Sequence, residues 1–241
     1  MDSTNKAART AGAIYLSLAL TAPFSMIYLP AKLIVRGNAT ATGENILNHE
    51  MLFRLGIVFD LFSSVIFICV GLALFRLLTS VNNTWAKAMV ALVLVSAAVS
   101  FLNTLNNIAA LTLFRGADFL NVFEKSQRDA LAYLFIRLHN QGEFINEIFW
   151  GLWLLPFGLL VYRSGFLPRF LGVWLILACF GYLGMSLVAL LFPTYYDVAF
   201  RIAQPLLIAE LAIILWLLIK GAKEPIPQTD AVAPSPSPVS A

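Results

Sequence analysis

Carboxylates and a histidine recur at helical spacing in a largely apolar segment of the chain. His139, Glu143 and Glu147 stand four residues apart, so in an α-helix they would lie one above the other on one slowly drifting face. Imidazole and carboxylate groups stacked in this way can share a proton or converge on one ion. The alternative is a network of hydrogen bonds between helices. The chain has only two histidines, a poor supply of metal ligands, and this favours the network.

Three more polar residues interrupt apolar runs elsewhere. Asp60 and Glu210 have no cationic residue one helical turn away, and Asn103 forms a helix-face cluster with Asn106 and Asn107. A charged side chain at the centre of a bilayer costs on the order of 2.5–3.5 kcal/mol, so such residues face a protein interior or a wet cavity. Asp60 and Glu210 are therefore candidates for a functional site, whereas the asparagine cluster is more typical of interhelical hydrogen bonds.

Three of the candidates are predicted to lie at one depth in the membrane. Each stands 16 residues from a basic residue at the end of its span: Asp60 from Arg76, Asn103 from Lys87 and Glu147 from Arg163. At 1.5 Å per residue, this common depth is roughly 24 Å from that end. We therefore predict a polar vestibule between the second, third and fourth spans, open to the outside, with Glu210 beneath or beside it.

The elements that carry these residues are predicted to be membrane-spanning helices. Hydrophobic residues make up 60% of the 241 positions and charged residues 12%, against about 45–50% and about 25% in a soluble domain. A span needs about 20 apolar residues, and six stretches qualify: those near 8–30, 53–78, 86–113, 131–162, 168–192 and 199–220. We predict an all-α polytopic bundle over residues 1–222 and a disordered, Pro- and Ser-rich tail over 223–241.

The fourth span is expected to be longer than the bilayer is thick. Helical character begins at Ser126, which with Asp129 resembles a capping box, and continues to Arg163. Such a helix would be roughly 56 Å long, against a hydrocarbon core of about 30 Å. It therefore projects outward by several turns or breaks near Gly142.

Basic residues near the span ends predict that both chain ends face the cytoplasm. Eight Lys and Arg fall on that side and seven on the other, so the count alone decides little. The eight lie in very short loops without acidic residues, whereas the seven lie in longer loops diluted by Asp and Glu. We expect a multi-pass protein of the plasma membrane.

Several classes of function are disfavoured. The sixteen Lys and Arg residues never form a stripe, which argues against nucleic-acid binding. The chain lacks a His-Glu-x-x-His, Gly-x-Ser-x-Gly or phosphate-loop motif, and its two cysteines have no metal-ligand spacing. We therefore expect no cofactor and no metal, and favour a non-enzymatic function.

Three interpretations stay open. The first is a site for a small molecule or ion at Asp60, Asn103, His139, Glu143, Glu147 and Glu210, with transport as a consequence. The second is a non-catalytic protein that contacts lipids or protein partners, in which the same residues are structural; no protein partner can be named. The third is an intramembrane hydrolase that uses His139 and Glu143.

Several stretches resemble a bacterial membrane protein family, DUF4386. They are Ala8–Gly12, Phe53–Val58, Leu138–Asn140 and, most specifically, Phe149–Tyr162 followed by Arg163–Pro168. The resemblance covers about residues 6 to 222. It implies a multi-pass bacterial membrane protein, with the bacterial inner membrane as its location, and assigns no activity and no binding residues.

Overall fold

The computed structural model describes residues 3–222, and the tail predicted to be disordered, 223–241, lies outside them. Within this range six helical segments are long and apolar enough to cross a membrane, which confirms the predicted all-α, multi-pass architecture. The spans are Thr4–Leu33, Glu50–Leu78, Asn83–Arg115, Lys125–Arg163, Arg169–Leu191 and Pro193–Ile219. Each predicted span falls on one of them, and most observed spans extend a few residues further.

Within residues 3–222, the elements follow one another as nine α-helices with short π- and 3₁₀-helical turns between them. In order they are α1 (Ser3–Pro23), η1 (Phe24–Tyr28), α2 (Leu29–Leu33), α3 (Ala39–Asn48), α4 (Glu50–Leu78), α5 (Asn83–Arg115), η2 (Asp118–Leu120), α6 (Lys125–Leu152), α7 (Leu154–Arg163), α8 (Arg169–Leu191), η3 (Pro193–Tyr195) and α9 (Tyr196–Ile219).

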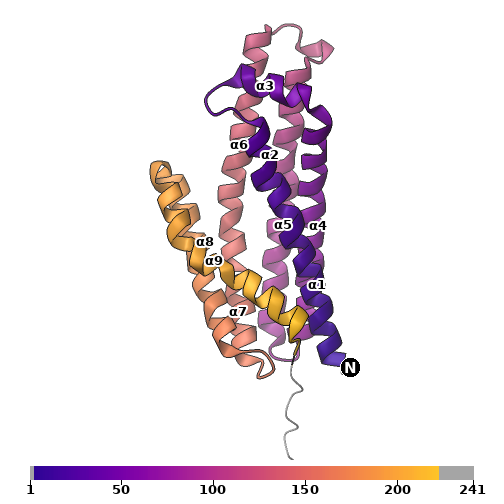
Figure 1. The fold of residues 1–241 in the computed structure, drawn as a ribbon, viewed down its shortest axis with the longest axis vertical. Coiled ribbons are helices and arrows are strands. Elements are labelled where there is room, and N and C mark those ends of the chain that lie inside the picture. The colour runs from indigo at the N-terminus through magenta and orange to yellow at the C-terminus, as the bar shows by residue number, and fades with distance from the viewer. Residues whose placement is uncertain (1–2, 223–241) are drawn as a thin grey trace, which may run out of the picture.

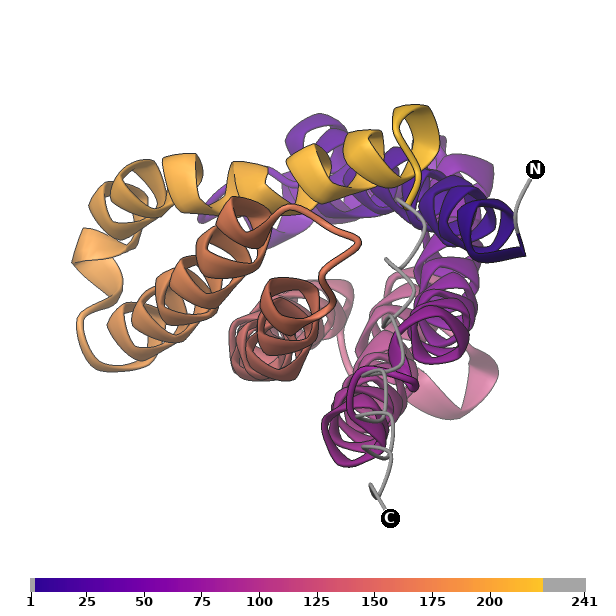
Figure 2. The ribbon, with the colours of Figure 1, turned by 90° about the horizontal axis from the view of Figure 1, so that it is seen from below.

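Both ends of the described chain lie at the same end of the bundle, opposite α3 (Figure 1). The Arg9 guanidinium there donates a hydrogen bond of 3.4 Å to the carbonyl of Ile219. α6 and α7 pack between α5 and α8, while α9 crosses α1 (Figure 2). Away from that crossing, the α8–α9 hairpin splays outward from the other helices (Figure 1). Which end faces the cytoplasm stays a prediction.

The first span, predicted near residues 8–30 and observed as Thr4–Leu33, contains a π-helical turn. α1 ends at Pro23, the five residues Phe24–Tyr28 form a π-helix, and α2 resumes at Leu29. Proline restricts the local backbone and cannot donate a backbone hydrogen bond, and π-helical turns within α-helices occur frequently at functional sites. This π-helical turn contributes Ser25 and Met26 to the lining of the cavity described below.

The fourth span projects well beyond a bilayer core and continues through Gly142. Its capping box is formed by Glu124 and Gln127, not by Ser126 and Asp129. Glu124 has an extended backbone and is therefore the first residue outside the helix. The break comes at Trp153 between α6 and α7, because Pro156 has no N–H to bond to the carbonyl four residues earlier.

The buried apolar side chains form two clusters separated along the bundle. One, near the chain ends, is built around Trp153, Phe157 and Leu74. The other, near α3, includes Ile46 and Ile136. The candidate site residues occupy the layer between the two clusters.

The outer faces of the spans are apolar. Phe62, Leu102, Phe180 and Ile202 are 57%, 67%, 61% and 72% exposed and come from four different spans. Such side chains are suited to contact with lipid, in agreement with the predicted bilayer partner.

Candidate functional site

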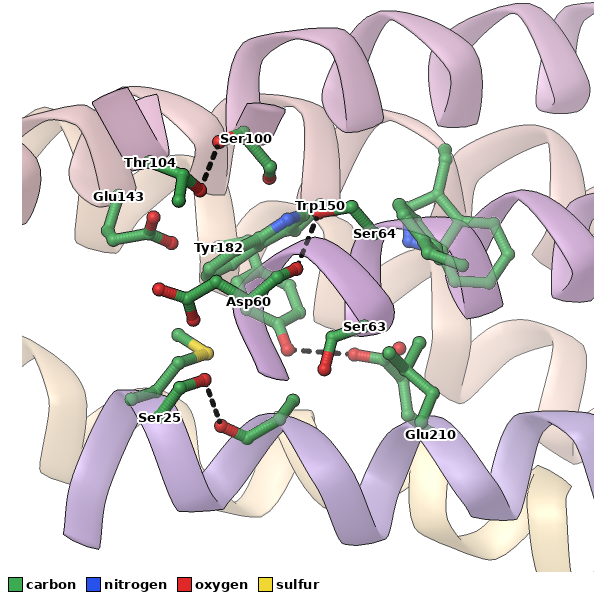
Figure 3. Close-up of a pocket in the computed structure, with 15 residues that line it drawn as sticks. Ser25, Asp60, Ser63, Ser64, Ser100, Thr104, Glu143, Trp150, Tyr182 and Glu210 are labelled. Atoms are coloured by element: carbon green, nitrogen blue, oxygen red, sulfur yellow. Dashed lines mark hydrogen bonds between the residues drawn. The ribbon is translucent and has the colours of Figure 1, made fainter. Parts of the chain in front are cut away.

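A cavity of about 230 Å³ lies in the polar layer between the two apolar clusters (Figure 3). It is bordered by the first span, α4, α5, α6, α8 and α9, and is therefore wider than the predicted vestibule between three spans. Its polar wall consists of Ser25, Asp60, Ser63, Ser64, Ser100, Thr104, Glu143 and Glu210. Its aromatic wall consists of Phe67, Trp150, Trp153 and Tyr182.

Three carboxylates from three spans line this cavity. Asp60 comes from α4, Glu143 from α6 and Glu210 from α9. Asp60 and Glu143 lie close together at one end, and Glu210 lies at the other end beside Tyr182 (Figure 3). Among the described residues that line the cavity, none is Lys or Arg.

His139 faces two of the carboxylates at once. Its Nε2 is 3.9 Å from a carboxylate oxygen of Asp60 and 3.9 Å from one of Glu143. Its Nδ1 is 3.3 Å from the carbonyl oxygen of Asn103, and because a carbonyl only accepts, Nδ1 donates. The arrangement leaves Nε2 as the ring nitrogen that faces the two acids.

Asn103 joins this group from α5. Its amide nitrogen donates to the Glu143 carboxylate at 2.8 Å and to the carbonyl of His139 at 2.9 Å. The close approach depends on Gly142, because a Cβ there would collide with the Asn103 amide. The structure thus brings together four predicted site residues, Asp60, Asn103, His139 and Glu143.

Glu210 is held by two tyrosines that the sequence analysis did not single out. The hydroxyl of Tyr15 in α1 donates to one carboxylate oxygen, and that of Tyr182 in α8 donates to the other at 2.8 Å. Tyrosines of membrane proteins concentrate at the interfaces. Their position inside long apolar spans was the available signal that they bind a buried polar partner.

Glu147 lies apart from the cavity, although it follows Glu143 by one turn. It is 4% exposed, and its Oε1 accepts a hydrogen bond of 2.7 Å from the hydroxyl of Tyr196 at the start of α9. Its Oε2 has no hydrogen-bond partner among the described residues. Four residues advance an α-helix by about 40° beyond a full turn, which is consistent with Glu147 leaving the cavity face.

A second, larger hollow of about 860 Å³ opens between the first span, α6 and the start of α9. Arg36, Arg137 and Asp197 are among the residues that line this space, which is called the outer hollow below. Met26, in the π-helix η1, borders both this outer hollow and the inner cavity. Across residues 3–222, no three His, Cys, Asp or Glu side chains are arranged to hold a metal ion.

Comparisons with known proteins give a family without an assigned activity. A family model described as a domain of unknown function, DUF4386, matches residues 10–221. An uncharacterized protein of Archaeoglobus fulgidus is 35% identical over 79 residues, which cover 33% of this chain and 46% of that protein. The match therefore spans less than half of the relative. No solved structure matches. Since the relative is archaeal, a bacterial source stays a prediction.

Proposed function

The chain belongs to the DUF4386 family, and we propose that it binds a small molecule or ion in the cavity between its apolar clusters, with transport as a consequence. The observation that carries the proposal is a cavity inside the membrane-spanning bundle lined by Asp60, Glu143 and Glu210. Ionisable residues within spans are costly and characteristically mark ligand or ion pathways. We place the protein in the plasma membrane.

Ligand binding explains the cavity better than a purely structural role in helix packing does. A volume of about 230 Å³ is several times the roughly 30 Å³ that one water molecule occupies in the liquid, so the cavity has room for a small solute. A core that served stability alone would gain by replacing three nearby carboxylates with apolar groups that fill the space, because buried charges are often neutral or costly for stability. The presence of three carboxylates around an unfilled cavity therefore supports a functional role for these residues.

The proposed route to the cavity runs through the outer hollow. Met26 borders both spaces and is 42% exposed, so a change of its rotamer would connect them. It belongs to the π-helix Phe24–Tyr28, where the backbone departs from regular α-helix. With both chain ends in the cytoplasm, as the basic residues predict, this route opens to the outside.

The proposal is tested by replacing each cavity carboxylate with its amide: Asp60→Asn, Glu143→Gln and Glu210→Gln. We expect free energies of unfolding within about 1 kcal/mol of wild type, or higher, because each amide keeps the shape and removes a buried charge. Thermal and detergent unfolding in lipid nanodiscs measure the effect. Glu50→Gln, at the surface of α4 where Glu50 pairs with Arg54 at 2.7 Å, is the control.

The competing function is a non-catalytic bundle in which the polar residues are structural. Its support is the set of interhelical hydrogen bonds among buried polar side chains, such as those of Asn146 with the hydroxyls of Ser96 and Ser100 at 2.9 and 2.7 Å. In that case each amide would remove a paired carboxylate and cost about 3–5 kcal/mol. Losses of that size at all three cavity positions would favour the structural function and overturn the binding proposal.

A further inference from the structure

We infer that the ligand of the cavity is an organic cation, namely a protonated amine attached to a compact apolar body. The inference rests on the proposed function and names the class of its ligand. Three separate features of the cavity carry it: the sign of its charges, the direction of its hydrogen bonds and the nature of its remaining wall.

The charges favour a cation. Asp60, Glu143 and Glu210 line the cavity, and none of the described lining residues is Lys or Arg. The nearby His139 Nε2, 3.9 Å from Asp60 and Glu143, supplies at most one positive charge against three carboxylates. A cation therefore gains from every ionised carboxylate, while an anion would be repelled by the same wall.

Most hydroxyl groups of the wall are oriented as acceptors; the exception is Ser100, whose oxygen accepts a hydrogen bond of 2.7 Å from the Asn146 amide. The Ser64 hydroxyl donates its proton to the carbonyl of Asp60 at 3.0 Å, and the Thr104 hydroxyl donates to the carbonyl of Ser100 at 2.9 Å. Likewise the Ser63 hydroxyl donates to Thr21 at 3.2 Å. Each oxygen is thereby left with lone pairs and no free proton. An ammonium group, which has donors and no acceptor, is the complement of such a wall.

The two tyrosine hydroxyls that donate to Glu210 are also left as acceptors toward the cavity. Both tyrosine hydroxyls that reach Glu210 direct their protons at its carboxylate oxygens. The Tyr182 oxygen therefore presents only lone pairs to a further partner, as the serine and threonine oxygens do. A neutral alcohol could use one acceptor of the cavity, whereas an ammonium group can use three at once.

The remaining wall is aromatic. Trp150 meets Tyr182 edge-on with ring centroids 6.3 Å apart, and Trp153 meets Phe67 edge-on at 5.1 Å. Indole and phenol rings attract cations over their faces and also pack against apolar groups. Together with a volume of about 230 Å³, this wall suits an amine with a small organic body better than a bare inorganic ion, which would leave most of the space unfilled.

The test compares three probes of one shape and different charge with the purified wild type in lipid nanodiscs. They are 2-phenylethylamine, 2-phenylethanol and 3-phenylpropionate; tetramethylammonium and Na⁺ complete the set. Binding is measured by calorimetry and by the shift in unfolding temperature. We expect the amine to bind at least about tenfold more tightly than the alcohol, and the carboxylate not to bind.

Variants separate the cavity from nonspecific uptake by the bilayer. Asp60→Asn is expected to weaken amine binding at least about tenfold, and Ser64→Ala less, while Glu50→Gln leaves it unchanged. Should Asp60→Asn fail to fold, Glu210→Gln tests the same charge requirement from another helix.

Each outcome has a definite meaning. If the alcohol binds as tightly as the amine, or if only Na⁺ binds in a manner that Asp60→Asn abolishes, the organic-cation inference is wrong and the proposed binding function stands. If no probe binds the wild type at all, both the inference and the proposed function fall. Amine binding that Asp60→Asn and Glu210→Gln leave unchanged places the ligand elsewhere and also overturns the inference.

Discussion

Glu143 and Glu147 stand one turn apart on α6, yet the two carboxylates have different surroundings. The Glu143 side chain keeps 22% exposure, lines the cavity and lies beside His139 and Asn103. Glu147 as a residue is 4% exposed and is covered by the first turn of α9, where Tyr196 donates to it at 2.7 Å. One face of the helix thus borders open space, and the adjacent face is packed.

Glu143 and Glu147 are the same residue type, so the difference between them comes from the helix that packs over each face of α6. Tyr196 closes the packed face with a hydrogen bond to Glu147 and a ring contact to Phe144, whose centroid is 4.6 Å away. The cavity face, where Glu143 lies, instead borders the cavity that Asp60 and Glu210 also line. The packed face should therefore respond to substitution through stability, and the cavity face through binding.

The largest expected effect concerns the point where α5 approaches the cavity face. Gly142→Ala places a methyl group against the Asn103 amide, and we expect a loss of about 2–3 kcal/mol from overpacking together with a displaced Asn103–Glu143 bond. Gly184→Ala is the matched control, because a Cβ in that helical position meets open space. The control should be neutral or stabilising by up to about 1 kcal/mol. Equal effects at both glycines would mean that α5 and α6 are not in close contact at Asn103.

A smaller effect is expected on the packed face. Tyr196→Phe removes the one hydrogen bond that Glu147 makes among the described residues, and we expect a loss of about 1–2 kcal/mol in the free energy of unfolding. Tyr195→Phe, at a neighbouring residue that is 63% exposed, should change stability by less than about 0.5 kcal/mol. Chemical unfolding in nanodiscs compares the two. If Tyr196→Phe is also neutral, Glu147 does not depend on α9, and the contrast between the two faces fails.

Hydropathy was sufficient to predict the six spans. Interruptions such as Asp60 and Glu210 were sufficient to locate polar groups within them, because the bilayer strongly penalises exposed charge at that depth. Hydropathy and spacing could not show that Glu143 lines the cavity and that Glu147 does not. Both lie on one helical stripe, and what separates them is the placement of α9, which follows from long-range packing.

Several local backbone features and long-range contacts could not be predicted from the sequence either. The π-helix at Phe24–Tyr28 depends on how the first span packs around Pro23, and the pairing of Tyr15 and Tyr182 with Glu210 joins three spans distant in the chain. The capping box was displaced by two residues, from Ser126 to Glu124. Competing carboxyl and hydroxyl caps within one turn are chemically similar, so composition alone does not choose between them.

Substitution of Met26 is expected to have the smallest effect on stability and a clear effect on the access of water-soluble reagents to the inner cavity. Met26→Ala removes a side chain that is 42% exposed and that borders both the inner cavity and the outer hollow, so stability should change by less than about 0.5 kcal/mol. In a background with Cys69 and Cys179 replaced by alanine, Ser64→Cys provides a reporter thiol inside the cavity.

We expect Met26→Ala to accelerate labelling of that thiol several-fold by a water-soluble, cationic methanethiosulfonate reagent, because the inner cavity then communicates with the outer hollow. The anionic sulfonate counterpart should label slowly in both backgrounds, since Asp60, Glu143 and Glu210 repel it. Leu20→Ala, at a residue of α1 that is 70% exposed, is the control and should leave both rates unchanged. Equal labelling with and without the Met26 side chain would show that the cavity face is reached by another route, and preference for the anionic reagent would show that its field has the opposite sign.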